Sequence, residues 1–396
     1  MSITTDPAQL PTFPMGRRQF DPPAEFAGLP PISPIRLPSG AAGWAVTALA
    51  PAKALLADPR ISSDRSRTES PIHGLNRRFD AVEPGMFIAM DDPEHAHYRK
   101  MLTGQFTVRR MRALEARVEE IVTERLDALV AGGAPGDLVA EFALPVPSLV
   151  ICELLGVHYD SREEFQETTR TLLSLTATIE QVRAARNRVV AFLTELVAQK
   201  RTHPDDALIS GLIEAGTLTD QELVNISVLL LIAGHETTAN MLSLGTFALL
   251  QHPEQMRLLR ADPDLVPTAV EELLRYLTIV GSTGLPRVAA QDIEIGGVCI
   301  RAGQTVLIAL PAVNRDPNLA ENPDTLDVTR PRTGHVAFGH GIHQCLGQQL
   351  ARTEMKIGYR QLLDRFPSLE LACDAADVPL RTDMGIYGVH ALPVRW

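Results

Sequence analysis

Apolar residues recur every three or four positions through most of 91–278, a spacing that Leu114, Val118, Ile121, Val122 and Leu126 illustrate. Residues at this spacing share one face of an α-helix, and the loops between such stretches are short and marked by Gly and Pro. The sequence therefore predicts a largely helical region over 91–278. The same spacing predicts one more helix over 345–365.

Shorter stretches typical of β-strands lie outside this region. Strands are expected at 35–37, 44–47, 293–300 and 305–308, with a strand pair between 369 and 394. The first 38 residues are rich in proline, which predicts an extended lead-in lying on the body of the protein. We expect one domain over 1–396 with a mainly α fold and a smaller β-rich lobe (α+β). The helical lobe would be 91–278 and 345–365, and the β-rich lobe about 30–60, 290–310 and 367–396.

The longest predicted helix has clear ends. Thr219 and Glu222 have the spacing of a capping box, and the helical pattern runs to Gln251, shortly before Pro253. At about 1.5 Å per residue this helix is roughly 45 to 50 Å long, enough to cross the protein. Its middle carries the polar run 234–238. Because polar groups are costly in a buried helix, this run indicates a function.

Composition and charge narrow the class of protein. The formal charge of −11 argues against a nucleic-acid partner, since binding phosphates requires a basic surface. No stretch reaches the roughly 20 apolar residues of a spanning helix, and the N-terminus lacks the apolar run of a signal peptide, so no membrane association is expected. Cys152, Cys299, Cys345 and Cys373 show no C-x-x-C spacing, which indicates neither a disulfide framework nor a zinc ribbon and favours the cytoplasm.

Residues 338–347 read FGHGIHQCLG and carry the strongest chemical signal in the chain. Their glycines allow a tight turn and bring the backbone close to a flat ligand. Cys345 precedes a helix expected from Leu346 onward, where unpaired N–H groups and the positive end of the helix dipole favour a thiolate over a thiol. Such a thiolate is a suitable ligand for iron.

This segment resembles the cysteine loop of the cytochrome P450 family, F-G-x-G-x-H-x-C-x-G, at every fixed position. The resemblance implies that Cys345 is the axial thiolate of haem b, iron protoporphyrin IX, and that Phe338, Gly347 and Ala233 lie against the cofactor. For Cys345 alone, the alternative is a small buried hydrophobic side chain.

A second motif, Glu272 and Arg275, matches the family's E-x-x-R, and the resemblance adds Arg330 as the third member of a buried triad. Side chains three residues apart share a helix face and can pair. We expect this triad to be structural.

A third motif, AGHET at 233–237, matches the family's [AG]-G-x-[DE]-T within the long helix. The resemblance implies that Gly234 leaves room for oxygen and substrate, that Thr237 hydrogen-bonds dioxygen, and that Glu236 helps to relay protons. The structural alternative is a threonine bonded to the helix's own carbonyls.

The two propionates of a haem need cationic or donor partners. His95 and Arg99 stand four residues apart on a helix expected to begin at Pro93, so they share a face. The resemblance assigns both to the propionates, together with Arg287 and His343. A surface ion pair is the alternative for each.

The resemblance also nominates a substrate pocket, whose residues are mostly apolar and suit a lipophilic molecule, although each can equally be core. They are Met86, Phe87, Ile88, Leu172, Leu175, Leu229, Ile232, Ala233, Ile279, Val280, Ile386 and Tyr387.

A basic cluster stands out on this acidic chain: Lys100, Arg109, Arg110, Arg112 and Arg117. It is either a solvated helix face or the docking surface of an electron donor. Members of the family without a fused reductase usually receive electrons from an acidic ferredoxin, which complementary charge would steer. Arg109, Arg110 and Arg112 are therefore the expected ferredoxin contacts.

The resemblance implies a monooxygenase that hydroxylates or epoxidises a lipophilic polyketide, terpenoid or steroid with O2 and electrons from ferredoxin and its reductase. A peroxide-driven peroxygenase and a haem sensor stay open, although neither needs Glu236 and Thr237. A zinc hydrolase is the alternative from another class, but Ala239 stands where H-E-x-x-H needs its second histidine. A dinucleotide loop at Gly339 fails because Gln344 replaces the third glycine.

Overall fold

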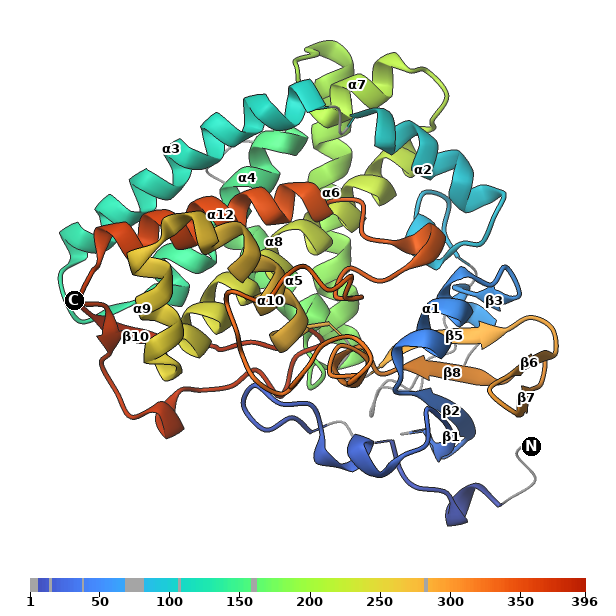
Figure 1. Cartoon of the computed structure of the whole chain (residues 1–396). Helices are drawn as coiled ribbons and strands as arrows, with labels where there is room; N and C mark the ends of the chain where they lie inside the picture. The colour runs from blue at the N-terminus through green and yellow to red at the C-terminus, as the bar shows by residue number, and fades with distance from the viewer. Residues whose placement is uncertain are drawn as a thin grey trace.

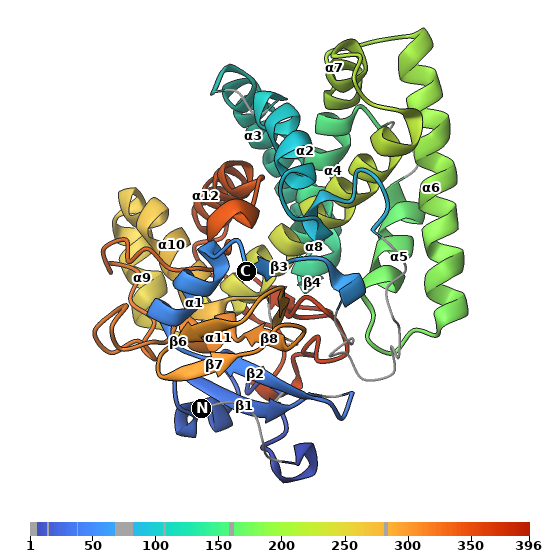
Figure 2. The same ribbon diagram turned by 90° about the vertical axis from the view of Figure 1, so that its right-hand side faces the viewer.

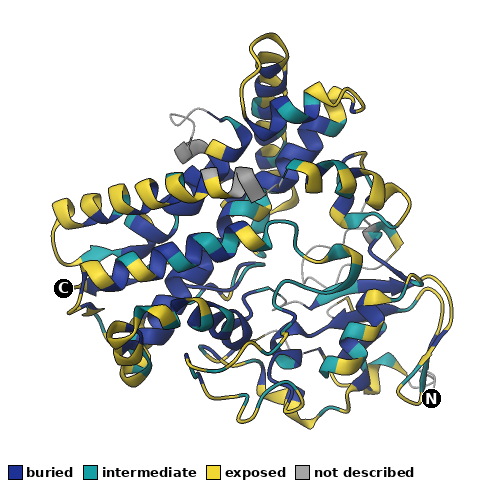
Figure 3. Cartoon of the chain, turned by 45° about the horizontal axis from the view of Figure 1, so that its top comes forward, coloured by how far each residue is buried: buried dark blue, intermediate teal, exposed yellow. Residues whose placement is uncertain are grey.

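The computed structural model describes residues 6–13, 16–37, 39–67, 82–105, 108–157, 162–280 and 284–396. Packed helices make up most of the molecule, and a small sheet lies to one side of them (Figure 1, Figure 2). The helices bury their inner faces and expose their outer ones (Figure 3). The predicted mainly α fold with a smaller β-rich part is confirmed. Within the described ranges, no helix combines the length and the apolar character needed to cross a bilayer.

The helices follow the predicted apolar spacing closely. Their bounds are α1 Leu49–Ala57, α2 Glu94–Gln105, α3 Val108–Gly132, α4 Pro145–Leu155, α5 Arg162–Leu173, α6 Ile179–Thr202, α7 Leu208–Glu214, α8 Asp220–Gln251, α9 Pro253–Ala261, α10 Val266–Leu277, α11 Leu310–Val313 and α12 Gln348–Arg365.

The long helix α8 has the predicted ends. Thr219 Oγ1 accepts from the Glu222 N–H, and the Glu222 carboxylate accepts from the Thr219 N–H at 2.7 Å, which completes the capping box. Nearly all of α8 is buried, in contact with α4, α6, α10 and α12. A helix of this length, about 48 Å at 1.5 Å per residue, holds residues on opposite sides of the molecule in fixed register.

One five-stranded sheet has the order β1-β2-β8-β5-β3. β2 and β8 run parallel, while the other neighbouring pairs are antiparallel. The sheet buries Trp44 and the apolar face of β8, forming a second core beside the helical one. Its strands are β1 Ile32–Arg36, β2 Ala42–Val46, β3 Ile61–Ser62, β5 Leu285–Ala289 and β8 Thr305–Ile308.

Two predictions about strands need correction. The single strand expected at 293–300 is a hairpin of β6 (Ile293–Ile295) and β7 (Val298–Ile300), because Gly296 and Gly297 turn the chain with positive φ. The strand pair expected between 369 and 394 is confirmed, because β9 (Glu370–Leu371) pairs with β10 (Pro393–Arg395). This pair does not join the five-stranded sheet, however: β10 also pairs with β4 (Gly136–Asp137) in a separate sheet, and Figure 1 shows β10 beside the helices.

The E-x-x-R triad lies in the core. Arg275 is fully buried on α10 and donates to both Glu272 oxygens at 2.8 Å. Arg330 Nε donates to Glu272 Oε1 at 3.1 Å, as expected. Arg275 also donates to the carbonyls of three residues in the irregular segment that leads to Cys345, so the triad fixes this segment to α10: Asn314, Pro323 and Thr325.

The proline-rich lead-in packs against the body of the protein through a buried arginine. Arg17 donates to the Thr278 carbonyl at 3.0 Å and to the Leu277 carbonyl at 2.6 Å, at the C-terminal end of α10. Its guanidinium lies 4.4 Å from the centroid of the Tyr387 ring. Burial is the main cause that lowers the pKa of Arg17 to about 10.

Candidate active site

The cysteine loop, residues 338–347, is closed by a backbone hydrogen bond and packs against α1. The Cys345 N–H donates to the Phe338 carbonyl at 2.9 Å, which closes the loop. Gly341 has a φ of +73°, a conformation that favours glycine. A Cβ at Gly341 would lie 2.2 Å from the Leu56 carbonyl oxygen in α1, so the loop backbone can approach α1 only without a side chain here.

The helix after this loop begins later than the sequence predicts. α12 starts at Gln348 with Gly347 as its N-cap, three residues past Cys345. Burial raises the pKa of the Cys345 thiol, although the Gly347 N–H and the charges of Arg99 and Arg352 act against this. The predicted helix start at Leu346 is therefore wrong by two residues, and the dipole of α12 acts on the sulfur from further away than expected. A bound metal ion, which deprotonates the thiol that ligates it, would supply what the helix dipole does not.

A cluster of imidazoles and guanidinium groups lies beside the cysteine loop. α2 begins at Glu94, not at the predicted Pro93, and places His95 and Arg99 one turn apart. The centroids of the His95 and His343 rings lie 4.2 Å apart. Nε2 of each ring is buried and has no hydrogen-bond partner among the described residues.

Positive charge and burial dominate this cluster. Burial, followed by the charges of His95, Arg287 and Arg99, lowers the pKa of His343 to about 3. Burial also lowers the pKa of His95, against the effect of Asp92. The other nitrogen of each ring faces an acceptor, the Asp92 carboxylate for His95 and the Met90 backbone for His343, so each Nε2 gains a hydrogen when its ring is protonated. Two protonated imidazoles next to guanidinium groups would fit a bound carboxylate. The structure thus brings together the four residues that the sequence assigns to haem propionates.

The middle of α8 is accessible along one stripe. Ala233 and Thr237 lie one turn apart and are less buried than most of the helix. Thr237 Oγ1 donates to the Ala233 carbonyl at 2.9 Å, so the structural alternative for this threonine is present, yet its oxygen can still accept a hydrogen bond. A Cβ at Gly234 would lie 2.8 Å from Ile151 Cδ1, so this glycine allows α8 and α4 to pack closely. That it also leaves room for oxygen stays a prediction.

Glu236 is buried and ion-paired. Its Oε2 accepts from Arg381 Nη2 at 2.8 Å, and both side chains are less than a tenth exposed. Asn240 Nδ2 donates to the Glu236 carbonyl at 2.7 Å. Oε1 faces His235, whose Nε2 lies 3.9 Å away. One carboxylate oxygen is therefore held by a guanidinium, while the other faces an imidazole.

The predicted pocket residues come partly together. Val280 and Ile386 form a β-bridge, which joins two predicted walls that are distant in sequence. Tyr387 turns away from them, because its hydroxyl donates to the Gln19 carbonyl at 2.7 Å and Arg17 stacks on its ring. We therefore retain Ile386, and not Tyr387, in the pocket.

The other predicted pocket residues differ in burial. Phe87, Leu229 and Ile279 are buried, and Ile88 is 40% exposed. Ala233 is exposed on its helix. Partly buried are Met86, Leu172, Leu175, Ile232, Val280 and Ile386.

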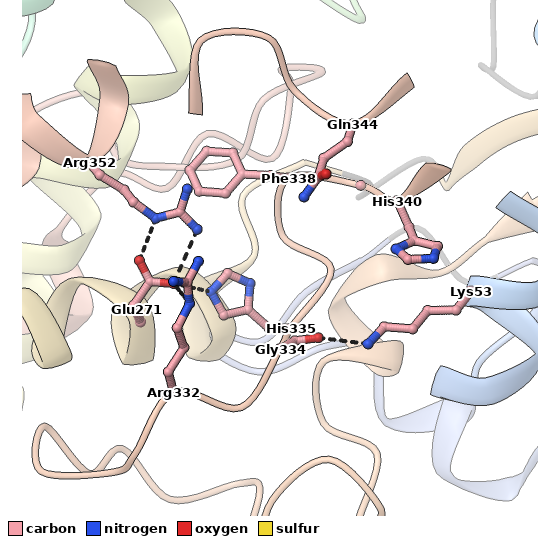
Figure 4. A pocket seen from close by; sticks show the side chains of 10 residues that line it. Lys53, Glu271, Arg332, Gly334, His335, Phe338, His340, Gln344 and Arg352 are labelled. Carbon is pink, nitrogen blue, oxygen red and sulfur yellow. Dashed lines mark hydrogen bonds and ion pairs between the residues drawn. The ribbon is translucent and has the colours of Figure 1, made fainter. Parts of the chain in front are cut away.

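A polar cavity of about 150 Å³ adjoins the cysteine loop (Figure 4). On one side, Glu271 forms ion pairs with Arg352 at 2.5 Å and with Arg332 at 3.3 Å. On the other, Lys53 Nζ donates to the Gly334 carbonyl at 3.0 Å. The remaining residues that line the cavity are His335, Phe338, Gly339, His340 and Gln344.

The cytochrome P450 family model matches residues 66–384. This chain belongs to the cytochrome P450 family. It is 47% identical over 380 residues to Cytochrome P450-SU2 of Streptomyces griseolus, covering 95% of this chain and 94% of that protein. It is also 47% identical to pentalenic acid synthase of Streptomyces avermitilis, with 97% of each chain covered.

Solved structures agree with this assignment. The crystal structure of CYP105P1 in complex with filipin I superposes on this P450 with a TM-score of 0.94 at 42% identity, covering 98% of this chain and 99% of that chain. The vitamin D3 dihydroxylase of Streptomyces griseolus is 43% identical over 406 residues, covering 100% of this chain and 99% of that protein. The protein is a cytochrome P450 monooxygenase.

Cytochromes P450 hold a haem through a cysteine thiolate, and the residues present here fit that group. The glycine loop presents Cys345, and the unsatisfied Nε2 atoms of His95 and His343 suit carboxylates. The zinc hydrolase alternative finds no support: among the described residues, no group of three or more His, Cys, Asp or Glu side chains is placed to hold a metal ion.

Sequence reasoning missed the residues that surround the acid. Arg381 lies in an irregular segment without a motif, and no local pattern indicates that it reaches Glu236 across 145 positions of sequence. His235 occupies the variable position of AGHET, so the motif assigns it no role. Its partner on α5, Thr169, likewise has no sequence signal.

Proposed function

We propose that this P450 hydroxylates or epoxidises a lipophilic polyketide, terpenoid or steroid, with two electrons that a ferredoxin reductase passes through a ferredoxin. Hydroxylation balances as RH + O2 + 2 e⁻ + 2 H⁺ → ROH + H2O. The observation that carries the proposal is the position of Cys345 beside guanidinium groups and two buried imidazoles, whose Nε2 atoms have no hydrogen-bond partner among the described residues. The names of the relatives, which refer to pentalenic acid and vitamin D3, support the substrate class.

The proposal assigns residues of this chain to each part of a haem site: the iron, the propionates and the ring. Cys345 would hold the iron of haem b, which supplies the redox chemistry when bound. His95, Arg99, Arg287 and His343 would bind the propionates. Lying against the ring would be Phe338, Gly347 and Ala233.

The reaction consumes two protons, and we assign their delivery to Glu236 and Thr237. Glu236 Oε1 is the carboxylate oxygen without a guanidinium partner in the described residues, so it is the atom that can take up and release a proton. Thr237 can pass a proton from its hydroxyl while its oxygen accepts another. Positioned proton transfer of this kind contributes about 10² to 10⁴ in rate.

The proposed pocket is apolar, as a lipophilic substrate requires. Phe87, Leu229 and Ile279 would form its buried wall, and the bridge between Val280 and Ile386 would form another. Binding is testable by spectral titration with vitamin D3 and filipin I, which represent two of the three compound classes. Displacement of the iron's water ligand by neither compound would argue against this substrate range.

The electron donor would approach the cysteine loop from the side of the polar cavity. Arg112 is exposed, whereas Arg117 is already ion-paired with Glu120 and Glu153. The side chains of Arg109 and Arg110 lie outside the described part of the structure. The cavity adds further positive groups to this side, among them Lys53 and Arg332.

Neutralising this surface tests the docking proposal. The triple variant R109Q/R110Q/R112Q should slow reduction by ferredoxin at low salt and flatten its salt dependence, because complementary charge steers association. R395Q removes another exposed arginine near the C-terminus and serves as the control. Equal reduction rates in the triple variant and the wild type would remove the docking proposal.

The whole proposal depends on sulfur ligation of a haem. The reduced protein with carbon monoxide should show the strongly red-shifted band of a thiolate-ligated haem, and C345A should lose it. Metal analysis should find iron, not zinc. Turnover with ferredoxin and reductase should exceed turnover with hydrogen peroxide; the reverse order would favour a peroxygenase. Retention of the band in C345A would overturn the assignment.

We also propose a cytoplasmic location and one domain over 1–396. No disulfide joins the four cysteines, all of which lie in the described residues, and this suits a reducing compartment. The triad at Glu272 and the buried Arg17 tie the lead-in and the segment before Cys345 to α10, which supports a single folding unit.

A further inference from the structure

Arg352, near the start of α12, has its side chain fixed beside the cysteine loop by three neighbours. Its Nε and Nη2 donate to the two Glu271 oxygens at 2.5 and 3.1 Å, which makes the ion pair two-pronged. Nη1 donates to Gln348 Oε1 at 3.0 Å and to the Gln348 carbonyl at 3.3 Å. The guanidinium carbon lies 4.5 Å from the centroid of the Phe338 ring. Because Arg352 is only 6% exposed and contacts all three residues, its positive charge has one fixed position.

One residue, Phe338, connects this charge to the proposed iron ligand. The Phe338 ring packs against Arg352, and the Phe338 carbonyl accepts the Cys345 N–H at 2.9 Å. The charge of Arg352 also acts on the sulfur itself, in the direction that lowers the pKa of the Cys345 thiol. A positive charge that favours a thiolate over a thiol also favours an added electron on a metal that the sulfur holds.

Glu271 offsets this charge only in part. Its carboxylate also pairs with Arg332, whose side chain is 67% exposed at the polar cavity (Figure 4). The one negative charge is thus shared between two guanidinium groups, and the three side chains together carry a net positive charge. Water at the exposed side screens Arg332 more than it screens the buried Arg352. The unscreened positive charge of the cluster is therefore the one that lies over the Phe338 ring.

We propose that Arg352 and Glu271 together set the reduction potential of the haem that Cys345 would hold, with Arg352 raising the potential and Glu271 lowering it. Reduction is Fe(III) + e⁻ → Fe(II), with the electron supplied by ferredoxin, and it lowers the charge of the site by one. A buried positive charge beside the cysteine loop stabilises the reduced state. Both residues act through the cysteine loop and are positioning residues. The inference rests on the proposed function, because it takes Cys345 as the iron ligand.

Spectroelectrochemical titration of the haem-loaded, substrate-free protein at pH 7 measures this potential without turnover. R352M removes the positive charge and should favour the ferric state by about tenfold, which is a shift of about 59 mV to lower potential. E271Q removes the negative charge but keeps an acceptor oxygen for Arg352, and should favour the ferrous state by about threefold. Loss of packing alone would not give opposite signs for the two partners of one ion pair.

The matched controls come from the exposed ion pair of Arg365 and Asp127, because Arg365 stands on the same helix, α12. R365M and D127N change the net charge as R352M and E271Q do, but water and salt screen this pair. Each control should therefore change the reduction equilibrium by less than about twofold. R352K keeps the charge of Arg352 and loses its two-pronged contact, so it should return the potential more than halfway from R352M to the wild type.

Shifts of the same sign in R352M and E271Q, or shifts no larger than in the two controls, would overturn the inference. A potential of R352K equal to that of R352M would do the same, since it would assign the effect to packing and not to charge. If R352M binds no haem, E271Q still has to raise the potential beyond D127N. If the wild type lacks the thiolate band with carbon monoxide, the proposed function itself fails. If the band is present and the potentials follow the controls, only this inference fails.

Discussion

Replacement of Arg275 by methionine should destabilise the protein severely. This side chain uses all five of its N–H donors. Nε and Nη2 each donate to the Glu272 carboxylate, and Nη1 donates to the carbonyls of Asn314 and Pro323. The second hydrogen of Nη2 goes to the Thr325 carbonyl. Breaking a buried ion pair by removing one partner costs about 3 to 5 kcal/mol. Arg330 keeps one bond to Glu272, which favours the lower end.

The carbonyls of Asn314 and Pro323 add to this cost. Each loses the arginine donor, at about 1 kcal/mol or more. The expected total for R275M is therefore about 5 to 6 kcal/mol, a large part of the 5 to 15 kcal/mol that stabilises an ordinary domain. R275K keeps the charge but not the two-pronged contact, and should lose roughly half as much.

Urea unfolding of the haem-loaded protein, followed by circular dichroism, measures this loss. R301M is the control, since Arg301 forms an exposed pair with Asp292 and should lose less than about 1 kcal/mol. A loss in R275M no larger than in R301M would refute the reasoning from burial. If R275M fails to fold, the test rests on R275K. The unfolding free energy of R275K should be lower than that of the wild type, but the variant should still fold.

Three further substitutions test separate parts of the structure. Burial opposes ionisation of Glu271, but hydrogen bonds and charges from His335 and Arg352 outweigh burial and lower the pKa of Glu271 from 4.5 to about 2. This carboxylate therefore stabilises the fold above pH 4.5, and its contribution is lost as the pH falls towards 2. E271Q should lower the unfolding free energy at pH 7 by about 3 kcal/mol and flatten its pH dependence in that window. G341A should yield far less protein with the carbon monoxide band than G339A, because both glycines have φ of +73° but only Gly341 meets a backbone carbonyl at 2.2 Å; equal yields would show that the contact with α1 is soft. R17M should cost about 2 to 3 kcal/mol in urea unfolding while R18M on the exposed neighbour costs under about 0.5, and similar losses would mean that the carbonyls at the end of α10 find other donors.

Local signals were sufficient for most of the helical framework. The capping box at Thr219 and the stop before Pro253 gave both ends of α8 to the residue, because capping chemistry acts within one turn. The hairpin at 293–300 was missed although Gly296 and Gly297 stand in its middle, since the apolar run across them outweighed the turn signal. The pair of β9 and β10 was predicted, but its pairing with β4 was missed because β4 is short and lies far away in sequence.

The site residues likewise fall into those that local sequence indicates and those that only tertiary contacts reveal. The cysteine loop, the E-x-x-R pair and the AGHET run are contiguous, so their residue types reveal them. Tertiary contacts that the sequence does not indicate are added at other positions: Gly234 packs against Ile151 of α4, and the Tyr387 hydroxyl donates to the Gln19 carbonyl in the lead-in. Burial raises the pKa of the Cys345 thiol, and α12 starts at Gln348, so the sequence placed the helix end too close to the sulfur.

Proton delivery shows why sequence reasoning stops short of mechanism here. Glu236 is named by its motif, but the groups around the acid come from two other parts of the chain: Arg381 near the C-terminus contacts Glu236, and Thr169 of α5 contacts the neighbouring His235. Neither contact spans a helical turn or a hairpin, so no periodicity encodes it. They exist only because α8, nearly 50 Å long, presents successive residues to different partners. A substitution at Arg381 therefore acts on the acid, although the sequence around Arg381 does not indicate this contact.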